Sequence, residues 1–403
     1  MEFSNELFSV FLPAWTLILF GVLTAFIITF ISIPPIIDLA RNRGLYDTPN
    51  GRTSHLKATP YLGGVAVFIG FIISTVTVAG FGFSRELTYI IAGLIIILFV
   101  GLKDDMMCIK PVNKLIGQLV ASGIIVILGG LQINNFHGVL GLYEIPYFAS
   151  VPFTIFFFIV VINGFNLIDG IDGLASGVSI LIASTLGIWF LGAGIPQYSV
   201  MSFALAGSLG AFFYYNVFSR KNKIFLGDAG SLITGLVVAI LTIRFIDGQT
   251  LAFGNLEFHA APAVAFGILI VPLFDTLRVF ILRISQGRSP FSADRQHIHH
   301  NLNDLGYSHL HTTLIMVVVN LGFIMLSVSL QHLRNLYLIA VQLSLAGILA
   351  YITALTLSRK RKKASISRMP LAREIEFRNE SAREYKEDDL PEKKEKLYHL
   401  KKI

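Results

Sequence analysis

The stretch NGFNLIDGIDGL at residues 163–174 lies between two apolar runs, 147–163 and 174–193. Each run approaches the roughly 20 residues that an α-helix needs to cross a bilayer. Asp169 and Asp172 therefore lie at the edge of predicted membrane spans, and the motif contains no Lys or Arg to pair with them. An Asp at the centre of a span costs roughly 2.5–3.5 kcal/mol on insertion scales, so acids in this position need a cation or a ligand.

Long apolar runs with polar edges recur along the whole chain. Hydrophobic residues make up 54% of the 403 residues and charged residues 14%, whereas soluble proteins carry about 25% charged residues. We predict an all-α polytopic membrane protein with eleven transmembrane helices. The expected spans are 11–37, 61–82, 87–102, 114–131, 147–163, 174–193, 197–218, 229–246, 260–282, 312–331 and 335–357, and Pro34–Pro35 is expected to kink or end the first.

Lys and Arg are distributed unevenly between the connections of these spans. One set of connections holds most of them, whereas the opposite set holds only Arg85, Arg244 and Arg334. The positive-inside rule makes the first set cytoplasmic, which puts the N-terminus outside and the C-terminus inside. We expect a transmembrane domain over 1–357 and a charged cytoplasmic tail over 358–403. The RKRKK run at 359–363 suits anionic lipid headgroups rather than nucleic acid.

Two further features of the sequence concern disulfide bonds and the predicted outer side. The single cysteine, Cys108, excludes an intrachain disulfide framework. The polar, glycine-rich segment 132–146 on the predicted outer side is compatible with a short hairpin.

Carboxylates end several predicted spans on the cytoplasmic side. Asp104 and Asp105 follow the third span, and Lys114 lies ten residues further on. Adjacent helical residues point about 100° apart, so the two acids are expected to have different partners. A carboxylate beside a phosphate acts as a general base or metal ligand, and a lysine neutralises phosphate charge. The alternative interpretation is that Asp104 and Asp105 lie in an ordinary solvated loop without a catalytic role.

Amides and acids recur every three residues in the central motif, as Asn163, Asn166, Asp169 and Asp172. This spacing keeps neighbours on one side of a helical turn. Asp228, in FLGDAGS at 225–231, either caps the helix that it opens or supplies a further oxygen to a metal. Oxygen ligands of this kind suit Mg²⁺, which retains water and substrate phosphates in its shell.

Two cytoplasmic loops supply cationic side chains. The loop at 47–64 carries Arg52, His55 and Lys57 and ends in Gly63–Gly64. It is read either as positive-inside charge with a glycine pair for close helix packing, or as a surface for a phosphorylated substrate. The loop at 283–311 lacks the cysteines of a structural zinc site and favours pyrophosphate binding, with structural histidines as the alternative. Its candidates are Arg295, His297, His299 and His300.

The motifs KDD, NGFNLIDGIDGLASG, FLGDAGS and DRQHIHH, in this order, resemble those of the polyprenyl-phosphate N-acetylhexosamine-1-phosphate transferases, the WecA/TagO/MraY group. The resemblance covers residues 35–305. It implies a bacterial cytoplasmic membrane enzyme that moves a sugar-1-phosphate from a UDP-sugar onto undecaprenyl phosphate and releases UMP. A homodimer is compatible with it.

The resemblance also implies individual roles. Asn166 and Asp228 match the positions that hold Mg²⁺, or Mn²⁺ in its place. Asp104 and Asp105 match the acidic pair, with Asp104 as the residue that deprotonates the lipid phosphate, and Asp169 and Asp172 match residues near the nucleotide and metal. Arg295, His297, His299 and His300 match the phosphate-binding loop. From their residue type and position, and not from the resemblance, we also expect substrate contacts from Arg52, His55, Lys57, Lys114 and Asn163.

The histidine motif distinguishes branches of this family. His-Ile-His-His at 297–300 is similar to the WecA/TagO side and favours UDP-GlcNAc, whereas three consecutive histidines are typical of the phospho-MurNAc-pentapeptide transferases. The lipid-linked product would enter O-antigen, common antigen, teichoic acid or capsule synthesis. The alternatives are the pentapeptide donor and, from another class, a proton-coupled secondary transporter. Transporter sites lie near the membrane midplane, whereas these acids crowd one face.

Overall fold

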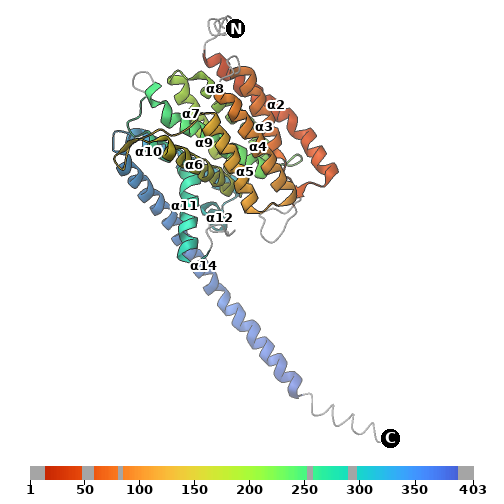
Figure 1. Cartoon of the computed structure of the whole chain (residues 1–403). Coiled ribbons are helices and arrows are strands. Elements are labelled where there is room, and N and C mark those ends of the chain that lie inside the picture. The colour runs from red at the N-terminus through yellow and green to blue at the C-terminus, as the bar shows by residue number, and fades with distance from the viewer. Residues whose placement is uncertain (1–13, 48–58, 80–84, 252–256, 289–296, 389–403) are drawn as a thin grey trace, which may run out of the picture. The chain divides into compact units, whose positions relative to one another are not determined.

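The computed structural model describes residues 14–47, 59–79, 85–251, 257–288 and 297–388 (Figure 1). The chain forms two compact units, residues 1–348 and 349–403, and the domain boundary expected at 358 stays a prediction. The helices are α2 (Ala14–Arg43), α3 (Gly63–Ala79), α4 (Arg85–Met107), α5 (Pro111–Gly123), α6 (Tyr147–Ile168), α7 (Leu174–Gly192), α8 (Pro196–Phe213), α9 (Gly227–Asp247), α10 (Ala261–Ile268), α11 (Ile270–Ser285), α12 (Ile298–Asp304), α13 (His309–Ser329) and α14 (Asn335–Asp388).

Short elements extend or connect these helices. The π-helical turns η1 (Ile124–Leu128) and η2 (Tyr214–Phe218) continue α5 and α8, and the 3₁₀ turn η3 (Gly248–Leu251) follows α9. Strands β1 (Tyr46–Asp47) and β2 (Thr59–Pro60) form one antiparallel pair, and β3 (Asn135–Val139) and β4 (Leu142–Glu144) form another. The second pair confirms the hairpin expected over 132–146.

The helices confirm a polytopic all-α membrane protein. Within the described residues, nine helices are long and apolar enough to cross a membrane, and the bent pair α10–α11 adds a tenth if it is counted as one span. The apolar stretch of α3, at 17 residues, is shorter than a typical span. Each of the eleven expected spans contains a helix, although their number and orientation stay predictions.

Two expected spans differ from their predicted form. The first helix was expected to kink or end at Pro34–Pro35; it does not end there, because α2 continues through both prolines to Arg43, and the kink stays a prediction. Its buried face also continues, through Ile33, Ile37 and Ala40, so packing offsets the backbone hydrogen bonds that the prolines remove. The span expected at 260–282 is instead bent by 81° between α10 and α11.

The bend between α10 and α11 is stabilised by a buried amide from a neighbouring helix. Asn320 of α13 donates to the carbonyl of Ile268 at 3.1 Å and accepts from the N–H of Val271 at 3.4 Å. Backbone groups freed by a break inside a membrane must find partners within the protein. Asn320 therefore satisfies groups on both sides of the break.

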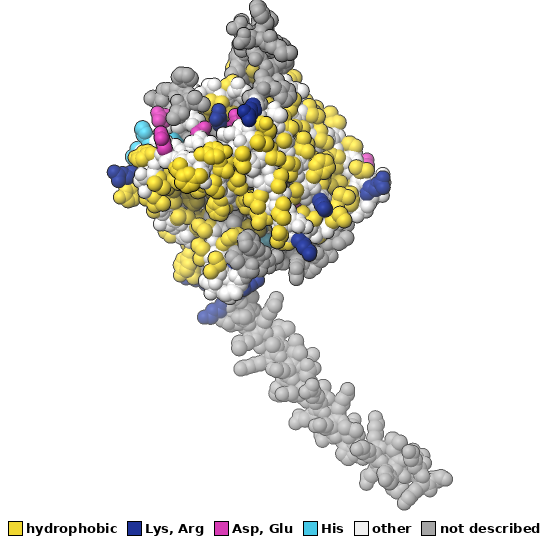
Figure 2. Space-filling model, viewed as in Figure 1, with side chains coloured by type: hydrophobic (Ala, Val, Ile, Leu, Met, Phe, Trp, Pro, Cys, Tyr) yellow, Lys and Arg dark blue, Asp and Glu magenta, His cyan; other side chains and the backbone are white. Residues whose placement is uncertain are grey.

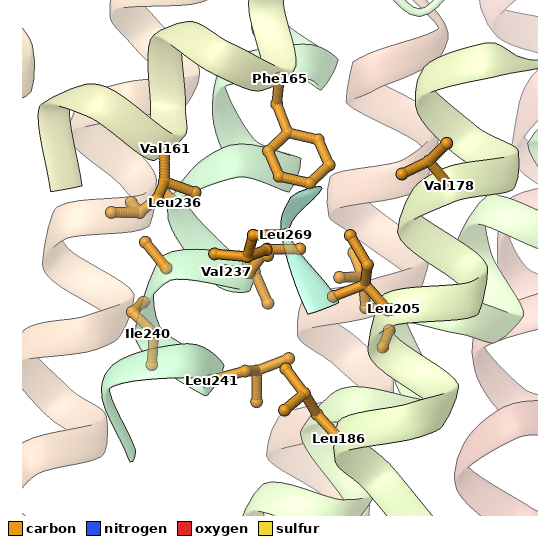
Figure 3. Close-up of a cluster of buried hydrophobic side chains, with 14 of the residues drawn as sticks. Val161, Phe165, Val178, Leu186, Leu205, Leu236, Val237, Ile240, Leu241 and Leu269 are labelled. Atoms are coloured by element: carbon orange, nitrogen blue, oxygen red, sulfur yellow. The ribbon is translucent and has the colours of Figure 1, made fainter. Parts of the chain in front are cut away.

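The central helix of the first unit is α9, which packs against α3, α4, α6 and α7. Nearly all its residues from Ala229 to Ile246 are buried. A helix that is apolar on every side belongs in a protein interior. Figure 3 shows buried side chains of α9, which are Leu236, Val237, Ile240 and Leu241, together with buried side chains of its surroundings, which are Val161, Phe165, Val178, Leu186, Leu205 and Leu269.

The exterior of the first unit is strongly apolar. Figure 2 shows hydrophobic side chains over most of the visible face. Large exposed side chains occur on several helices, for example Phe20 of α2, Phe99 of α4 and Phe156 of α6. Such a continuous apolar surface is typical of contact with lipid rather than water.

Glycines let two helices approach the start of α9. A Cβ on Gly64 of α3 would lie 2.2 Å from the backbone nitrogen of Gly230, and one on Gly101 of α4 would lie 2.3 Å from the Cα of Ala229. Gly63 and Gly64 also donate backbone hydrogen bonds to the carbonyls of Phe225 and Leu226. Close helix packing, one reading of the Gly63–Gly64 pair, is therefore confirmed.

Candidate functional site

The ammonium group of Lys114, at the start of α5, lies where the ends of three other helices meet. Its Nζ is 2.9 Å from Asp104 Oδ2 of α4 and 2.7 Å from Asp228 Oδ1 of α9. It also donates to Asn166 Oδ1 of α6 at 3.2 Å. Residues far apart in the sequence thus place three oxygens around one cation. Their contact agrees with the expectation that they lie on one side of the membrane.

Asp105 has a different role from its neighbour Asp104. Its carboxylate accepts hydrogen bonds from the backbone N–H groups of Asp228 at 2.7 Å and Ala229 at 3.0 Å. It therefore caps the N-terminus of α9, where N–H groups lack partners within the helix. Asp104 accepts from the N–H of Ile109 at 2.9 Å and turns its other oxygen to Lys114. The expectation of different partners for the two acids is confirmed.

A glycine with a left-handed backbone makes this cap fit. Gly227 has φ +74°, and a Cβ there would lie 2.3 Å from the carbonyl oxygen of Tyr61 and 2.8 Å from a carboxylate oxygen of Asp105. Glycine alone adopts this conformation without strain. Asp228 lies in the first turn of α9, but its side chain contacts Lys114 and Asn166. The capping role considered for Asp228 therefore belongs to Asp105.

Hydrogen bonds hold both asparagines of the central motif in place. Asn166 donates to Asp228 Oδ1 at 2.5 Å and to Ser231 Oγ at 2.9 Å. Asn163 donates to Gln118 Oε1 of α5 at 2.8 Å and accepts from Gln118 Nε2 at 3.4 Å. The two amides thereby tie α6 to α9 and α5 respectively, and Asn166 keeps its Oδ1 toward the cation.

Asp169 ends α6 beside this cluster. It is half-buried and makes no hydrogen bond or ion pair within the part of the chain that the structure describes. Burial raises the pKa of Asp169 well above its usual value, and the carboxylates of Asp228 and Asp105 add to the rise. A carboxyl group in this setting takes up a proton or a cation readily.

Asp172 has basic partners, both at its Oδ2. It binds Lys223 Nζ at 2.7 Å and His309 Nδ1 at 2.9 Å. Burial alone would raise the pKa of Asp172, but the hydrogen bonds from His309 and Lys223 outweigh burial and lower it. The premise that the acids of this motif have no basic partner is therefore wrong for Asp172. α6 ends at Ile168, so the chain turns and carries Asp172 away from the helical line of Asn163 and Asn166.

The turn at 170–173 is tied to the loop before α9. Gly173 has φ +80° and donates its N–H to Asn216 Oδ1 of η2 at 2.7 Å, while Asn216 donates to the carbonyl of Ile224 at 2.9 Å. A π-helical turn redirects side chains out of α-helical register. Here that change places Asn216 between Gly173 of the central motif and Ile224, which precedes the FLGDAGS motif.

The histidine motif is anchored by an acid that sequence reasoning missed. Asp275 of α11, 1% exposed, contacts His297 Nδ1 at 3.0 Å and accepts from the N–H of Ile298 at 3.1 Å. It also pairs with Arg278 at 3.3 Å. An acid inside an apolar run, as in VPLFDTLRV at 271–279, is the sequence signal that reveals it.

The rings of His297, His299 and His300 form a cluster in which His297 and His299 are stacked. The ring centroids of His299 and His300 are 4.3 Å apart. Burial lowers the pKa of His299 to about 3, and the neighbouring His300 adds to the fall, so the His299 ring is neutral. A Cβ on Gly170 would lie 2.6 Å from His299 Nε2. The histidine segment therefore packs directly on the Gly-Asp motif after α6.

Two groups of residues separate the expected site from the observed one. The first group was expected but lies outside the described part of the chain, and the second group lies at the site but was not expected. Arg52, His55, Lys57 and Arg295 belong to the first group. Gln118, Ser231, Lys223 and His309 belong to the second, together with Asp275. Lys223 and His309 lie in polar segments between spans, but nothing in their spacing links them to Asp172.

The donor set around Lys114 fits a divalent cation. Two carboxylates and an amide oxygen converge on a positively charged nitrogen. Mg²⁺ is commonly bound by one or two carboxylates, with the remaining positions filled by water and substrate phosphates. No group of three His, Cys, Asp or Glu within the described residues is placed to hold a metal, so the fit depends on the amide of Asn166.

Comparison with known proteins shows what the chain is similar to. Residues 87–246 match the family described as glycosyl transferase family 4. The chain is 30% identical to a probable undecaprenyl-phosphate N-acetylglucosaminyl 1-phosphate transferase of Bacillus subtilis, over 83% of this chain and 92% of the relative.

Two further relatives bear similar names. One is a decaprenyl-phosphate N-acetylglucosaminephosphotransferase of Mycobacterium tuberculosis, 30% identical over 73% of this chain and 78% of the relative. The other is an undecaprenyl-phosphate alpha-N-acetylglucosaminyl 1-phosphate transferase of Escherichia coli K12, 30% identical over 67% and 72%. The identity and coverage of these matches show that the chain belongs to the polyprenyl-phosphate N-acetylhexosamine-1-phosphate transferases, a family of membrane phosphotransferases.

Proposed function

We propose that this protein transfers N-acetylhexosamine-1-phosphate, most specifically GlcNAc-1-phosphate, from a UDP-sugar to undecaprenyl phosphate in a bacterial cytoplasmic membrane. UMP leaves, and the lipid-linked pyrophosphate sugar starts a cell-surface polysaccharide. The observation that carries the proposal is the convergence of Asp104, Asn166 and Asp228 on one cation position.

The location of this convergence suits a lipid phosphate. All three oxygens lie at helix ends on the side that the distribution of Lys and Arg predicts to be cytoplasmic. A polyprenyl phosphate keeps its chain in the bilayer and its headgroup at the membrane edge, which is where these helix ends would meet it.

Mg²⁺ is part of the proposal. Asp228 and Asn166 would hold it, with Asp104 as a further oxygen close by. When bound, it would offset the mutual repulsion of the two anionic substrates and stabilise the departing UMP. Ser231 and Asp105 position these ligands, the first through the amide of Asn166 and the second through the backbone of Asp228.

The remaining residues bind substrate and handle the proton. Asp104 is the group proposed to accept the proton of the lipid phosphate, because its carboxylate is free of helix capping. His297 and His299 are held against the Gly-Asp motif by Asp275 and Gly170. In that position the histidine segment would form one wall of a phosphate-binding site.

The sugar donor is assigned from two separate observations. The motif at 297–300 is His-Ile-His-His, and the three relatives named above bear N-acetylglucosamine names. Both favour UDP-GlcNAc over UDP-MurNAc-pentapeptide. The relatives' names differ between undecaprenyl and decaprenyl phosphate, so undecaprenyl phosphate is proposed as the acceptor by analogy with the first of them.

The test is an assay of UMP release by the purified protein in detergent with undecaprenyl phosphate and Mg²⁺. UDP-GlcNAc and UDP-MurNAc-pentapeptide are supplied separately, and a mock purification from cells that do not express the protein is the control for contaminating activity. UMP release with UDP-GlcNAc alone is expected. Release with the pentapeptide donor alone would keep the reaction and change the branch. No release with either donor, or with a panel of UDP-N-acetyl sugars, would refute the proposal and favour a transporter.

A further inference from the structure

Lys114 uses every proton of its ammonium group on the protein itself. An ammonium carries three N–H donors, and three oxygens accept them, from Asp228 at 2.7 Å, Asp104 at 2.9 Å and Asn166 at 3.2 Å. The side chain is only 15% exposed. In this arrangement Lys114 has no donor left for a substrate phosphate, although its position beside the site suggested that role.

The three oxygens that bind Lys114 are also those proposed to face the metal. Mg²⁺ binds oxygen at about 2.0–2.1 Å and needs the space at the centre of its ligands. That space holds the Lys114 ammonium, and two cations on the same oxygens would repel each other strongly in a half-buried site. The two cations therefore compete for one position.

We propose that Lys114 is a built-in placeholder for the divalent cation, one that leaves its three oxygens when Mg²⁺ binds. This inference rests on the proposed metal site. The lysine stem is flexible, so the ammonium can move without a shift of α5. Its release frees three donors beside the metal, where the substrate phosphates arrive. The lysine thus stabilises the acids while the metal is absent and becomes a phosphate-binding group only once the metal is present.

The exchange predicts a specific effect on metal affinity in the absence of any substrate. If Lys114 competes with the metal, then its removal tightens metal binding. If it instead supports the metal site, its removal weakens binding or has no effect. A suitable control is Lys103, which is exposed on α4 next to Asp104. Lys103→Met removes the same charge from the same region without vacating the oxygens.

The experiment measures Mn²⁺ binding to the full-length protein in detergent from the EPR signal of the free ion, followed by displacement with Mg²⁺. Lys114→Met is expected to bind both ions about tenfold more tightly than wild type, and Lys103→Met to stay within about twofold, since exposed charges are screened. Unchanged or weaker binding by Lys114→Met overturns the placeholder but leaves the proposed function standing. Absence of saturable binding in every protein overturns both.

A second measurement on the wild-type protein avoids dependence on the folding of a variant. Lysine acetylation by an amine-reactive ester, without substrate, is followed at each site by mass spectrometry. Mg²⁺ is expected to increase the labelling rate of Lys114 several-fold and to leave that of Lys103 unchanged. Protection of Lys114 by Mg²⁺, or equal rates with and without it, would contradict release of the ammonium group.

Discussion

The side chain of Asp105 accepts a hydrogen bond from the backbone N–H of Asp228 at 2.7 Å, so one acid of the pair 104–105 holds the helix that carries the proposed metal ligand. The other acid, Asp104, faces Lys114. The two adjacent carboxylates thus have different contacts. We therefore expect variants of Asp105 to lose stability and variants of Asp104 to lose turnover.

Asp105→Ala removes the acceptor for two N–H groups at the start of α9. Loss of a cap or of a buried acceptor costs about 1–3 kcal/mol, so we expect a lower Tm together with lower turnover. Thermal unfolding in detergent, beside the UMP assay, measures both. Asp105→Asn keeps one acceptor oxygen and should recover part of the Tm. A normal Tm for Asp105→Ala would show that the cap contributes little.

Asp104→Asn keeps the shape of the side chain and removes its basicity. Loss of a general base lowers turnover by about 10²–10⁴-fold, and we expect this loss with a Tm close to wild type. The pH–rate profile of any residual activity, measured with excess enzyme, should lose its acidic limb. A variant that turns over normally would exclude Asp104 as the proton acceptor.

Asp228→Asn tests the metal assignment. The substitution removes the negative charge that faces the cation and leaves the backbone contact with Asp105 in place. We expect the Mg²⁺ concentration for half-maximal activity to rise by about 10–100-fold. Asp247→Asn, at the opposite end of α9, is the matched control and should behave as wild type. Normal activity with unchanged Mg²⁺ dependence in Asp228→Asn would refute the assignment.

The pairing of Asp172 with Lys223 predicts a pH-dependent contribution to stability. Because the pKa of Asp172 is lowered in the folded state, this contribution is complete above the unfolded pKa of about 3.9. It disappears as the pH falls through the folded pKa. Lys223→Met should therefore lower stability by about 1–2 kcal/mol at pH 7, and its Tm should approach that of wild type only as the pH falls from about 4 through the lowered folded pKa of Asp172. A difference in Tm that stays constant from pH 7 down to about pH 2 would exclude the ionic contact as its cause.

Asp275→Ala tests the anchor of the histidine segment. The residue is expected to act through His297 and the backbone of Ile298 rather than on substrate directly. Loss of such a support typically costs about 10–100-fold in activity. We expect the KM for UDP-GlcNAc to rise with little change in Mg²⁺ dependence, and Asp275→Asn to recover part of the loss. Asp304→Asn, an exposed position on α12, serves as the control. An unchanged KM would leave Asp275 a structural residue only.

Hydropathy and motif order predict the membrane class and the helical segments because both depend on local composition. They also bring Asp104, Lys114, Asn166 and Asp228 to one side, and the structure places these residues in contact. The three-residue spacing was a wrong guide at Asp172, because α6 ends at Ile168 and Asp172 lies beyond the helix. The partners Lys223, His309 and Asp275 depend on tertiary packing, which no spacing rule in a single sequence contains.

The glycine contacts at the start of α9 have a consequence for how the site changes shape. Backbone meets backbone at Gly64–Gly230 and Gly101–Ala229, without side chains between them to rearrange. Because of this direct contact, we expect the ends of α4 and α9, which bear Asp104 and Asp228, to keep their relative positions. Asn166 also ties the end of α6 to α9, so we expect any rearrangement around a substrate in the Lys114 side chain and the histidine segment.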